Sequence, residues 1–265
     1  MRVQMRRNTQ LIGRWLLTVF GLVVIFTIMA CHGQNKAAKP GGDSAGSAGA
    51  APLNTLTTRE KRDGWVLLFD GKTTRGWRGI YLDHFPEHGW TIQDGALTVQ
   101  TAADPSQRGG SIISDKQYSH FELSLEFKYG EDANSGIKYF VVEREQPTPG
   151  HGLGLEYQIW NDEQPREADK RLGSLYDLIP ATNKIVKPVG EWNTARILVR
   201  GNHVEHWLNG RKVVEFERGS EHFRQLVAAS KYKDVPGFGE DPRGHILLQD
   251  EGLYNAFRNI KIREF

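Results

Sequence analysis

The sequence predicts an all-β domain, folded as a sandwich of two antiparallel sheets. About a dozen short apolar or alternating runs are separated by dense turn signals, which is typical of hairpin-connected strands. Only one segment has clear helical spacing, and there is no rhythm of strand, helix and parallel strand. The region after residue 54 holds roughly 210 residues, which is ample for one such domain with a large core.

The first half of the domain contains five expected strands, each marked by alternation or by a flanking turn. They cover 65–69, 90–92, 96–99, 120–129 and 136–143. The sequence Gln93-Asp94-Gly95 is a hairpin turn between the second and third of them. The run 120–129 alternates Phe and Leu with Glu, Ser and Lys, so one of its faces is expected to be buried.

The second half contains more strands and the single expected helix. The strands cover 152–160, 173–177, 192–200, 203–208, 212–216, 244–249 and 256–263. Two turn sequences, Gly201-Asn202 and Asn209-Gly210, join three of them into a meander. Ser220 can cap a helix over 220–229, where apolar residues have helical spacing. The charged segment 161–172 is expected to be a long loop.

The N-terminus has the pattern of a bacterial lipoprotein signal peptide. Four arginines precede an apolar run from Trp15 to Ala30 that is short for a membrane span. The run ends at Cys31, the only cysteine, in a sequence that resembles a lipobox. Cys31 is therefore the expected lipidation site, and the domain is expected to be anchored in the cell envelope, facing the periplasm. An uncleaved N-terminal membrane anchor is the alternative.

Composition divides the chain into three parts. Residues 1–30 are assigned to the signal peptide, 31–54 to the lipidated cysteine and a flexible Ala/Gly/Ser-rich tether, and 55–265 to the folded domain. The formal net charge is +2, and loss of residues 1–30, with four arginines and no acidic residue, would leave −2. No basic stripe interleaved with aromatic residues occurs, which argues against a nucleic-acid partner.

The run 152–160 carries the polar side chains that suggest a site. With period 2 it divides into a core face of Leu153, Leu155, Tyr157 and Ile159 and a polar face of Gly154, Glu156, Gln158 and Trp160. The strand is expected to be central in its sheet, so Glu156 should be partly desolvated. One interpretation is a structural carboxylate paired with an arginine. The other is a sugar site, where an indole covers the apolar ring face while carboxylate and amide bind hydroxyls.

Seven phrases occur in one order along residues 60–265. They are 65–71 (Trp-Val-Leu-Leu-Phe-Asp-Gly), 134–137 (Asn-Ser-Gly-Ile), 156–159 (Glu-Tyr-Gln-Ile), 190–193 (Gly-Glu-Trp-Asn), 206–210 (His-Trp-Leu-Asn-Gly), 248–250 (Leu-Gln-Asp) and 257–260 (Phe-Arg-Asn-Ile). In this order and spacing they resemble the 3-keto-disaccharide hydrolase domain family. The chain departs from the family pattern at Glu251, where the phrase Leu-Gln-Asp-His-Gly usually has histidine.

The resemblance implies a concanavalin A-like jelly-roll sandwich that acts on glycosides already oxidised at C3. The implied reactions are a 3-keto-glycoside 1,2-lyase step and a 3-keto-2-hydroxyglucal hydratase step, which together amount to hydrolysis. It also implies that a separate sugar 3-dehydrogenase acts first. No cofactor and no metal-binding residue is assigned, and a divalent-cation requirement stays open. A non-catalytic, lectin-like glycan-binding lipoprotein is the alternative, and a structural envelope lipoprotein is a third interpretation.

The implied elimination needs a base near C2, a donor to the enolate oxygen and a donor to the leaving oxygen. Glu156 is the expected base. Arg258 could stabilise the enolate, or could instead form a buried ion pair with Glu126 or Glu156. Lys138 could donate to the ketone, or could be an ordinary solvated lysine of the sheet.

Further residues are expected to bind substrate or to fill the core. The substrate-binding candidates are Asn134, Gln158, Trp160, Asp177, Lys231 and Asp250. His206, Trp192 and Trp207 are expected in the core. The sandwich-glucanase pattern Glu-x-Asp-x-x-Glu is absent, which argues against an ordinary two-carboxylate glycosidase.

The assignment of Cys31 leads to a direct test. In Cys31→Ser the thiol that would carry the lipid is lost, so we expect release from the membrane fraction or blocked processing. Fractionation followed by immunoblotting measures both. Unchanged processing together with unchanged membrane retention would rule out the lipoprotein interpretation.

Overall fold

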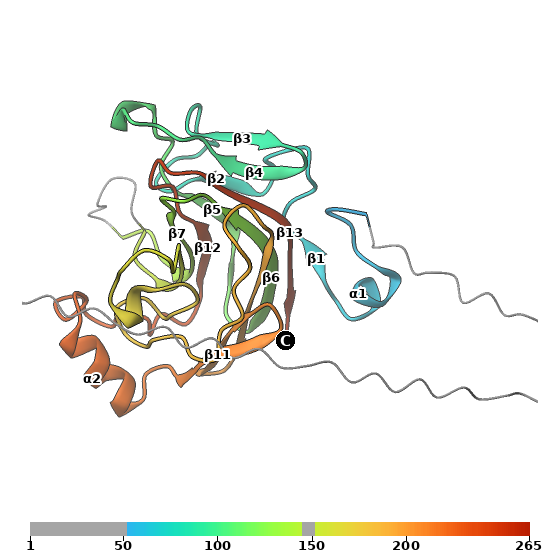
Figure 1. Ribbon diagram of the computed structural model, residues 1–265. Helices are drawn as coiled ribbons and strands as arrows, with labels where there is room; N and C mark the ends of the chain where they lie inside the picture. Colours follow the sequence, from blue (N-terminus) through green and yellow to red (C-terminus); the bar gives the residue numbers. More distant parts are fainter. Residues whose placement is uncertain (1–51, 145–151) are drawn as a thin grey trace, which may run out of the picture. The chain divides into compact units, whose positions relative to one another are not determined.

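The computed structural model describes residues 52–144 and 152–265, and the described chain forms a two-sheet antiparallel sandwich (Figure 1). The eight-stranded sheet has the order β11 (Arg211–Glu217), β10 (His203–Leu208), β9 (Asn193–Arg200), β6 (Phe121–Tyr129), β13 (Asn255–Glu264), β4 (Ala96–Val99) and β3 (Trp90–Gln93), with β1 (Val66–Leu67) also paired to β13. The five-stranded sheet has the order β2 (Trp77–Gly79), β5 (Ile112–Tyr118), β12 (Gly244–Leu248), β7 (Asn134–Val141) and β8 (Leu155–Trp160). The predicted all-β sandwich is confirmed.

The helices and two of the strands add detail that the sequence prediction lacked. Helix α2 (Glu221–Ala229) begins at the predicted cap, Ser220. A second helix, α1 (Thr58–Arg62), was missed although Thr57 and Glu60 form a readable capping box. Strands β2 and β5 were also missed. Two short 3₁₀ turns occur at Pro105–Gln107 and Ala168–Lys170. No helix in the described ranges is long and apolar enough to span a bilayer.

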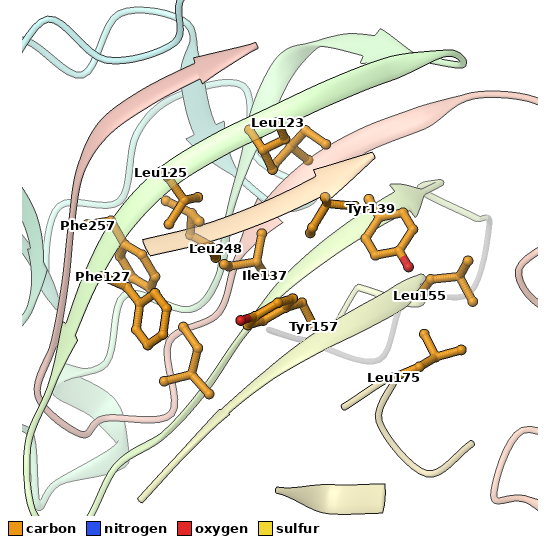
Figure 2. Close-up of a cluster of buried hydrophobic side chains, with 14 of the residues drawn as sticks. Leu123, Leu125, Phe127, Ile137, Tyr139, Leu155, Tyr157, Leu175, Leu248 and Phe257 are labelled. Atoms are coloured by element: carbon orange, nitrogen blue, oxygen red, sulfur yellow. The ribbon is translucent and has the colours of Figure 1, made fainter. Parts of the chain in front are cut away.

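The core fills the space between the two sheets, and Figure 2 shows its central part. Strands β6 and β13 contribute Leu123, Leu125, Phe127 and Phe257, which face Ile137, Tyr139, Leu155, Tyr157 and Leu248 of β7, β8 and β12. All of these side chains are fully buried or nearly so. Leu153, expected in the core, lies before the start of β8 and is 42% exposed.

Strand β8 is an edge strand of its sheet, so the expectation that it is central is wrong. Its outer edge is nevertheless hydrogen-bonded, because the segment 173–176 runs alongside it. The backbone amide of Gln158 donates to the Ser174 carbonyl over 3.1 Å, and the backbone amide of Tyr176 donates to the Glu156 carbonyl over 3.0 Å. The segment 173–177, predicted as a strand, forms only isolated bridges at Leu175. It still keeps the backbone of β8 paired on both sides.

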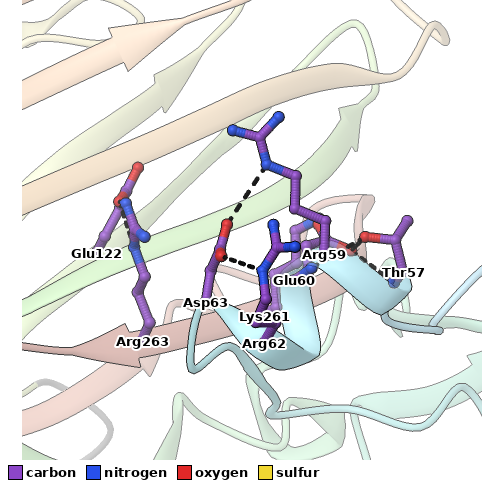
Figure 3. A network of polar contacts seen from close by, with 8 residues as sticks. All are labelled: Thr57, Arg59, Glu60, Arg62, Asp63, Glu122, Lys261 and Arg263. Atoms are coloured by element: carbon purple, nitrogen blue, oxygen red, sulfur yellow. Dashed lines mark hydrogen bonds and ion pairs between the residues drawn. The ribbon is translucent and has the colours of Figure 1, made fainter.

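Helix α1 packs on β13 through charged contacts (Figure 3). Glu60 accepts a hydrogen bond from Lys261, while Thr57 and Glu60 complete the capping box. Next to this contact, the buried Glu122 forms an ion pair with Arg263, in which Oε2 of Glu122 lies 2.5 Å from Nη2 of Arg263. The fold also includes Asn54, assigned to the tether from sequence. Asn54 is buried and exchanges two hydrogen bonds with Asn259.

Trp192 and Trp207 were expected in the core, and this expectation is wrong. Both are half-buried and covered by guanidinium groups. Arg258 lies 3.9 Å from the Trp192 ring centroid, and Arg196 lies 4.3 Å from that of Trp207. Indole rings that support arginines in this way gain cation–π attraction while part of each ring stays in contact with solvent.

His206, by contrast, is a fully buried core residue, as expected. Its Nε2 lies 2.8 Å from the Tyr139 hydroxyl, and its Nδ1 lies 3.1 Å from the Gly173 carbonyl oxygen. The carbonyl can only accept, so Nδ1 carries the proton and Nε2 accepts from the tyrosine. Burial lowers the pKa of His206 to about 4.

This burial makes stability depend on pH. Between about pH 6.5 and 4 the unfolded chain protonates His206 but the folded chain does not, so stability falls as the pH falls through this window. We expect His206 to account for a loss of about 3 kcal/mol across it. Urea unfolding at pH 7 and pH 4.5 measures the loss, with His206→Gln as the non-titrating control. An equal loss in both proteins would contradict the assignment.

Candidate functional site

A polar pocket lies against the face of the five-stranded sheet that points away from the core. Its volume is about 290 Å³. Strand alternation places it there, because Leu155, Tyr157 and Ile159 face the core while Glu156 and Gln158 project to the other side. The lining consists of Asn134, Lys138, Gly152, Leu153, Gly154, Glu156, Gln158, Arg166, Tyr176, Lys231, Tyr232, Gln249 and Glu251.

The floor of the pocket carries a buried ion pair. Lys138 and Glu156 are directly opposite each other on β7 and β8, and Lys138 Nζ lies 3.5 Å from Glu156 Oε2. Their side chains are only 10% and 5% exposed. Lys138 also donates to the Gly152 carbonyl over 3.2 Å. A buried carboxylate is tolerated when it is paired in this way, and here it remains at the surface of a cavity that a substrate can enter.

Gly136 makes room for this carboxylate. A Cβ atom at Gly136 would lie 2.4 Å from Glu156 Oε1 and 2.9 Å from its Cδ. The Glu156 side chain therefore lies over the backbone of β7. Any larger residue at position 136 would force it to move.

Two amide side chains add hydrogen-bonding groups that have no partner. Gln158 Nε2 donates to Asn134 Oδ1 and to the Ile159 carbonyl, each over 3.1 Å, which fixes the orientation of the amide. Its Oε1 is buried without a hydrogen-bond partner among the described residues, and so is Oε1 of Gln249. Buried acceptors of this kind are normally satisfied, so these two oxygens are exceptions, and both belong to residues that line the pocket.

Cationic and aromatic side chains form the walls. Arg166 stacks on Trp160 at 4.0 Å and donates to the Tyr176 hydroxyl over 3.4 Å. Lys231 Nζ lies 4.2 Å from the Tyr176 ring centroid. Burial of its ammonium lowers the pKa of Lys231, and the Glu156 carboxylate opposes that shift. Burial raises the pKa of Tyr232, so its phenol stays protonated at neutral pH.

Three predicted substrate-binding residues lie beside the pocket and do not line it. Trp160 is covered by Arg166. Asp177 accepts from the Lys231 backbone amide over 2.8 Å and pairs with Lys170 at 3.3 Å, so it shapes the wall. Asp250 is buried and accepts from the backbone amides of residues 109, 110 and 252. Burial raises the pKa of Asp250, although these three amides oppose the shift.

Arg258 does not belong to the pocket, so the expectation that it joins Glu156 there is wrong. It lies on β13 in the other sheet, where Glu126 is its direct cross-strand partner. Its Nε donates to Glu126 Oε2 over 2.6 Å, and its guanidinium stacks on Trp192. This is the ion pair that the sequence left open as the alternative.

Other lining residues were missed by the sequence reasoning. They are Arg166, Tyr176, Tyr232, Gln249 and Glu251. Arg166 lies in a segment that the sequence marked only as a charged loop. Gln249 and Glu251 stand next to the predicted Asp250, and alternation after β12 indicates that they, and not Asp250, share the pocket face.

One surface group outside the pocket has metal-ligand chemistry in the described part of the chain. His203, Glu205 and Glu215 have ligand atoms within 4.8 Å of one another. Lys212 Nζ already contacts both carboxylates, at 3.3 Å and 2.5 Å. The group lies on β10 and β11 in the eight-stranded sheet, so it takes no part in the pocket.

Fold and pocket together define a class, the β-sandwich proteins with a carbohydrate-type site. A lining of amides, carboxylates, cations and aromatic rings is typical of sites that bind hydroxyl-rich ligands. Residues 64–263 match the family described as 3-keto-alpha-glucoside-1,2-lyase-like domain, and the chain belongs to this family.

Individual relatives agree with this membership. A Bacteroides thetaiotaomicron protein named 3-keto-disaccharide hydrolase is 31% identical over 272 residues, covering 89% of this chain and 93% of that protein. A crystal structure from Parabacteroides distasonis, described as a candidate glycosyl hydrolase, has a TM-score of 0.72 at 31% identity, covering 81% of this chain and 100% of that one. A second protein of the same description and organism has a TM-score of 0.58 at 29% identity, covering 76% and 99%.

The close approach at Gly136 leads to a stability test. In Gly136→Ala the new methyl group would displace the Glu156 carboxylate from Lys138, and we expect a loss of roughly 1–3 kcal/mol in unfolding free energy. Gly130→Ala is the matched control, because a Cβ there would meet nothing closer than 3.6 Å. Urea unfolding measures both variants. Equal stability of the two would contradict the steric account.

Proposed function

We propose that the protein cleaves 3-keto-glycosides by removing the C2 proton, expelling the C1 substituent, and adding water to the resulting glucal. The net reaction is hydrolysis. Membership of the 3-keto-alpha-glucoside-1,2-lyase-like family supports this proposal, as does the name of the Bacteroides relative. The sign of the charge in the pocket supports elimination over direct displacement.

That charge is the observation that carries the proposal. Three cationic side chains, Lys138, Arg166 and Lys231, line the pocket, against two carboxylates. Direct glycosidases pass through an oxocarbenium-like transition state, which is positive and is disfavoured by such surroundings. Elimination from a 3-keto-glycoside passes through an enolate, which is negative. Preorganised cations stabilise charge that develops in this way.

Glu156 is suited to be the base in this scheme. The C2 proton and the C3 oxygen are close neighbours in the sugar, so the base and the group that stabilises the enolate must also be neighbours. Glu156 and Lys138 meet this requirement, because their charged atoms lie 3.5 Å apart on the pocket floor. Glu156 takes the proton, and the Lys138 ammonium donates to the oxygen that becomes negative.

The amides and aromatic rings supply binding. The amide side chains of Asn134, Gln158 and Gln249 line the pocket and hydrogen-bond sugar hydroxyl groups, which orients the ring above Glu156. The aromatic side chains of Tyr176 and Tyr232 cover the apolar face of the sugar ring. Arg258, expected from the sequence to steady the enolate, has no role in this scheme, and Lys138 takes its place.

Two further parts of the proposal concern where and when the protein acts. We place the domain in the cell envelope, tethered through Cys31, which lies outside the described residues. Elimination requires the C3 ketone, so a separate oxidation of the sugar, by a 3-dehydrogenase, must precede this step.

Substitution of Glu156 tests the role of the base. Glu156→Gln keeps the shape but cannot accept the proton, so turnover of a 3-keto-glucoside should fall by on the order of 10²–10⁴ while binding persists. Mass spectrometry follows the product, and calorimetry follows binding. Glu191→Gln is the matched control, since Glu191 is exposed and outside the pocket.

The same experiment in heavy water separates the two mechanisms. A protonated carboxyl open to the pocket exchanges its proton quickly compared with typical turnover, so the product should carry deuterium at C2. A product without deuterium at C2, formed only from the 3-keto substrate, would indicate direct displacement. Binding of glycans without turnover of any 3-keto-glycoside would instead support the lectin-like alternative.

A further inference from the structure

The pocket contains a second carboxylate, which the scheme above has not used. Glu251 lines the pocket just beyond the end of β12. Its Oε1 accepts a hydrogen bond from Gln249 Nε2 over 2.6 Å. No hydrogen bond to its Oε2 and no ion pair to its carboxylate is formed within 52–144 and 152–265. Glu251 is thus held in place through one oxygen, and its side chain lines the pocket.

The two carboxylates come from opposite sides of β7, Glu156 from β8 and Glu251 from the segment that follows β12. Glu156 extends from β8 and lies over Gly136, as the 2.4 Å approach to a Cβ at that position shows. On the other side, the backbone amide of Gln249 donates to the Gly136 carbonyl over 3.0 Å. This bond holds the segment that carries Glu251 next to the same glycine. Both carboxyl groups line the same pocket, so a ligand bound there meets one from each side of β7.

The environments of the two carboxylates differ in a way that suits different tasks. Glu156 is buried and paired with Lys138. Glu251 is half-buried and is accompanied by a neutral amide. Glu156 lies beside the ammonium that faces the C3 oxygen, so it is placed for the C2 proton, and Glu251 is the carboxyl group that remains for the C1 oxygen.

We propose that Glu251 is the general acid that protonates the departing C1 oxygen, and then the general base that activates water for addition at C1. This proposal rests on the proposed function and assigns a second catalytic residue to the same pocket. One carboxyl group can serve both steps. After it has given its proton to the leaving oxygen it is a carboxylate, and a carboxylate is the base that the addition of water requires.

The proton balance closes over the two steps. In the elimination, the C2–H bond breaks and its proton goes to Glu156, the C1–O bond breaks, and the Glu251 proton goes to the alcohol that leaves. In the hydration, Glu251 takes a proton from water, the hydroxide adds to C1, and Glu156 returns a proton to C2. Both carboxyl groups end as they began. The net change is one water consumed and one alcohol released, with no other reactant.

Substrates with different leaving groups test this role. A methyl 3-keto-glucoside releases a poor leaving group that needs an acid, whereas a 4-nitrophenyl 3-keto-glucoside releases a stable phenolate. For Glu251→Gln we expect kcat to fall by on the order of 10²–10⁴ with the methyl substrate, and by less than about tenfold for release of nitrophenol. The glucal should accumulate in that variant, because hydration has lost its base, and mass spectrometry detects it as a product lighter by one water.

Two other variants keep the failure of this inference distinct from failure of the proposed function. Glu251→His supplies another side chain able to carry a proton and should recover much of the rate with the methyl substrate. Glu156→Gln should lose activity with both substrates, because the C2 proton must be removed whichever leaving group is present. Equal losses with both substrates in Glu251→Gln, without accumulated glucal, would overturn the role of Glu251 alone. No turnover of either substrate by the unaltered protein would overturn the proposed function itself.

Discussion

The register between β7 and β8 is the constraint on which both the core and the pocket depend. It pairs Lys138 with Glu156 and Gly136 with Gln158, and it turns Tyr139, Leu155 and Tyr157 toward the other sheet. Side chains alternate along a strand, so a shift of one residue would put the carboxylate into the core and the tyrosine into the pocket. The segment 173–176 reinforces this register by pairing with the outer edge of β8.

Buried charge is tolerated in this fold because each group has a specific partner. On the outside of the eight-stranded sheet, Glu122 is almost fully buried but receives both Arg196 and Arg263. On the pocket floor, Lys138 and Glu156 compensate one another. The difference lies in access. Arg196 and Arg263 cover the Glu122 carboxylate. The Lys138–Glu156 pair instead borders a cavity whose lining residues include amides with unpartnered oxygens. Buried pairing alone therefore does not mark a site, but pairing beside unsatisfied polar groups does.

The sequence predicted the floor of the pocket and, among its walls, only Lys231, for a physical reason. Period-2 alternation determines which side chains share a face of one strand, so Glu156 and Gln158 could be placed together from the pattern of 152–160. Alternation does not determine which strands become neighbours. Arg258 was misplaced because its partner, Glu126, follows from the pairing of β13 with β6. The walls come from loops and from the turn after α2, whose positions depend on tertiary contacts such as the stacking of Arg166 on Trp160. Strand β5 was missed because its residues 115–117 are polar and its buried positions cluster at its ends.

The resemblance led to the expectation of histidine at position 251, where the chain has Glu251. From the sequence alone, glutamate in place of histidine would indicate the loss of an acid–base group. In the fold, Glu251 is held by Gln249 on the far side of Gly136 from Glu156, so the pocket still offers two groups able to move protons. The reacting atoms C1 and C2 are adjacent in the sugar, and a site that serves both must bring its two proton carriers close to one small area. Gly136 meets that demand, because it lets the Glu156 carboxyl group lie over β7 while Glu251 approaches from the segment after β12. In the scheme that we propose, elimination and hydration share one pocket, with the glucal held between the same two carboxyl groups until water has added.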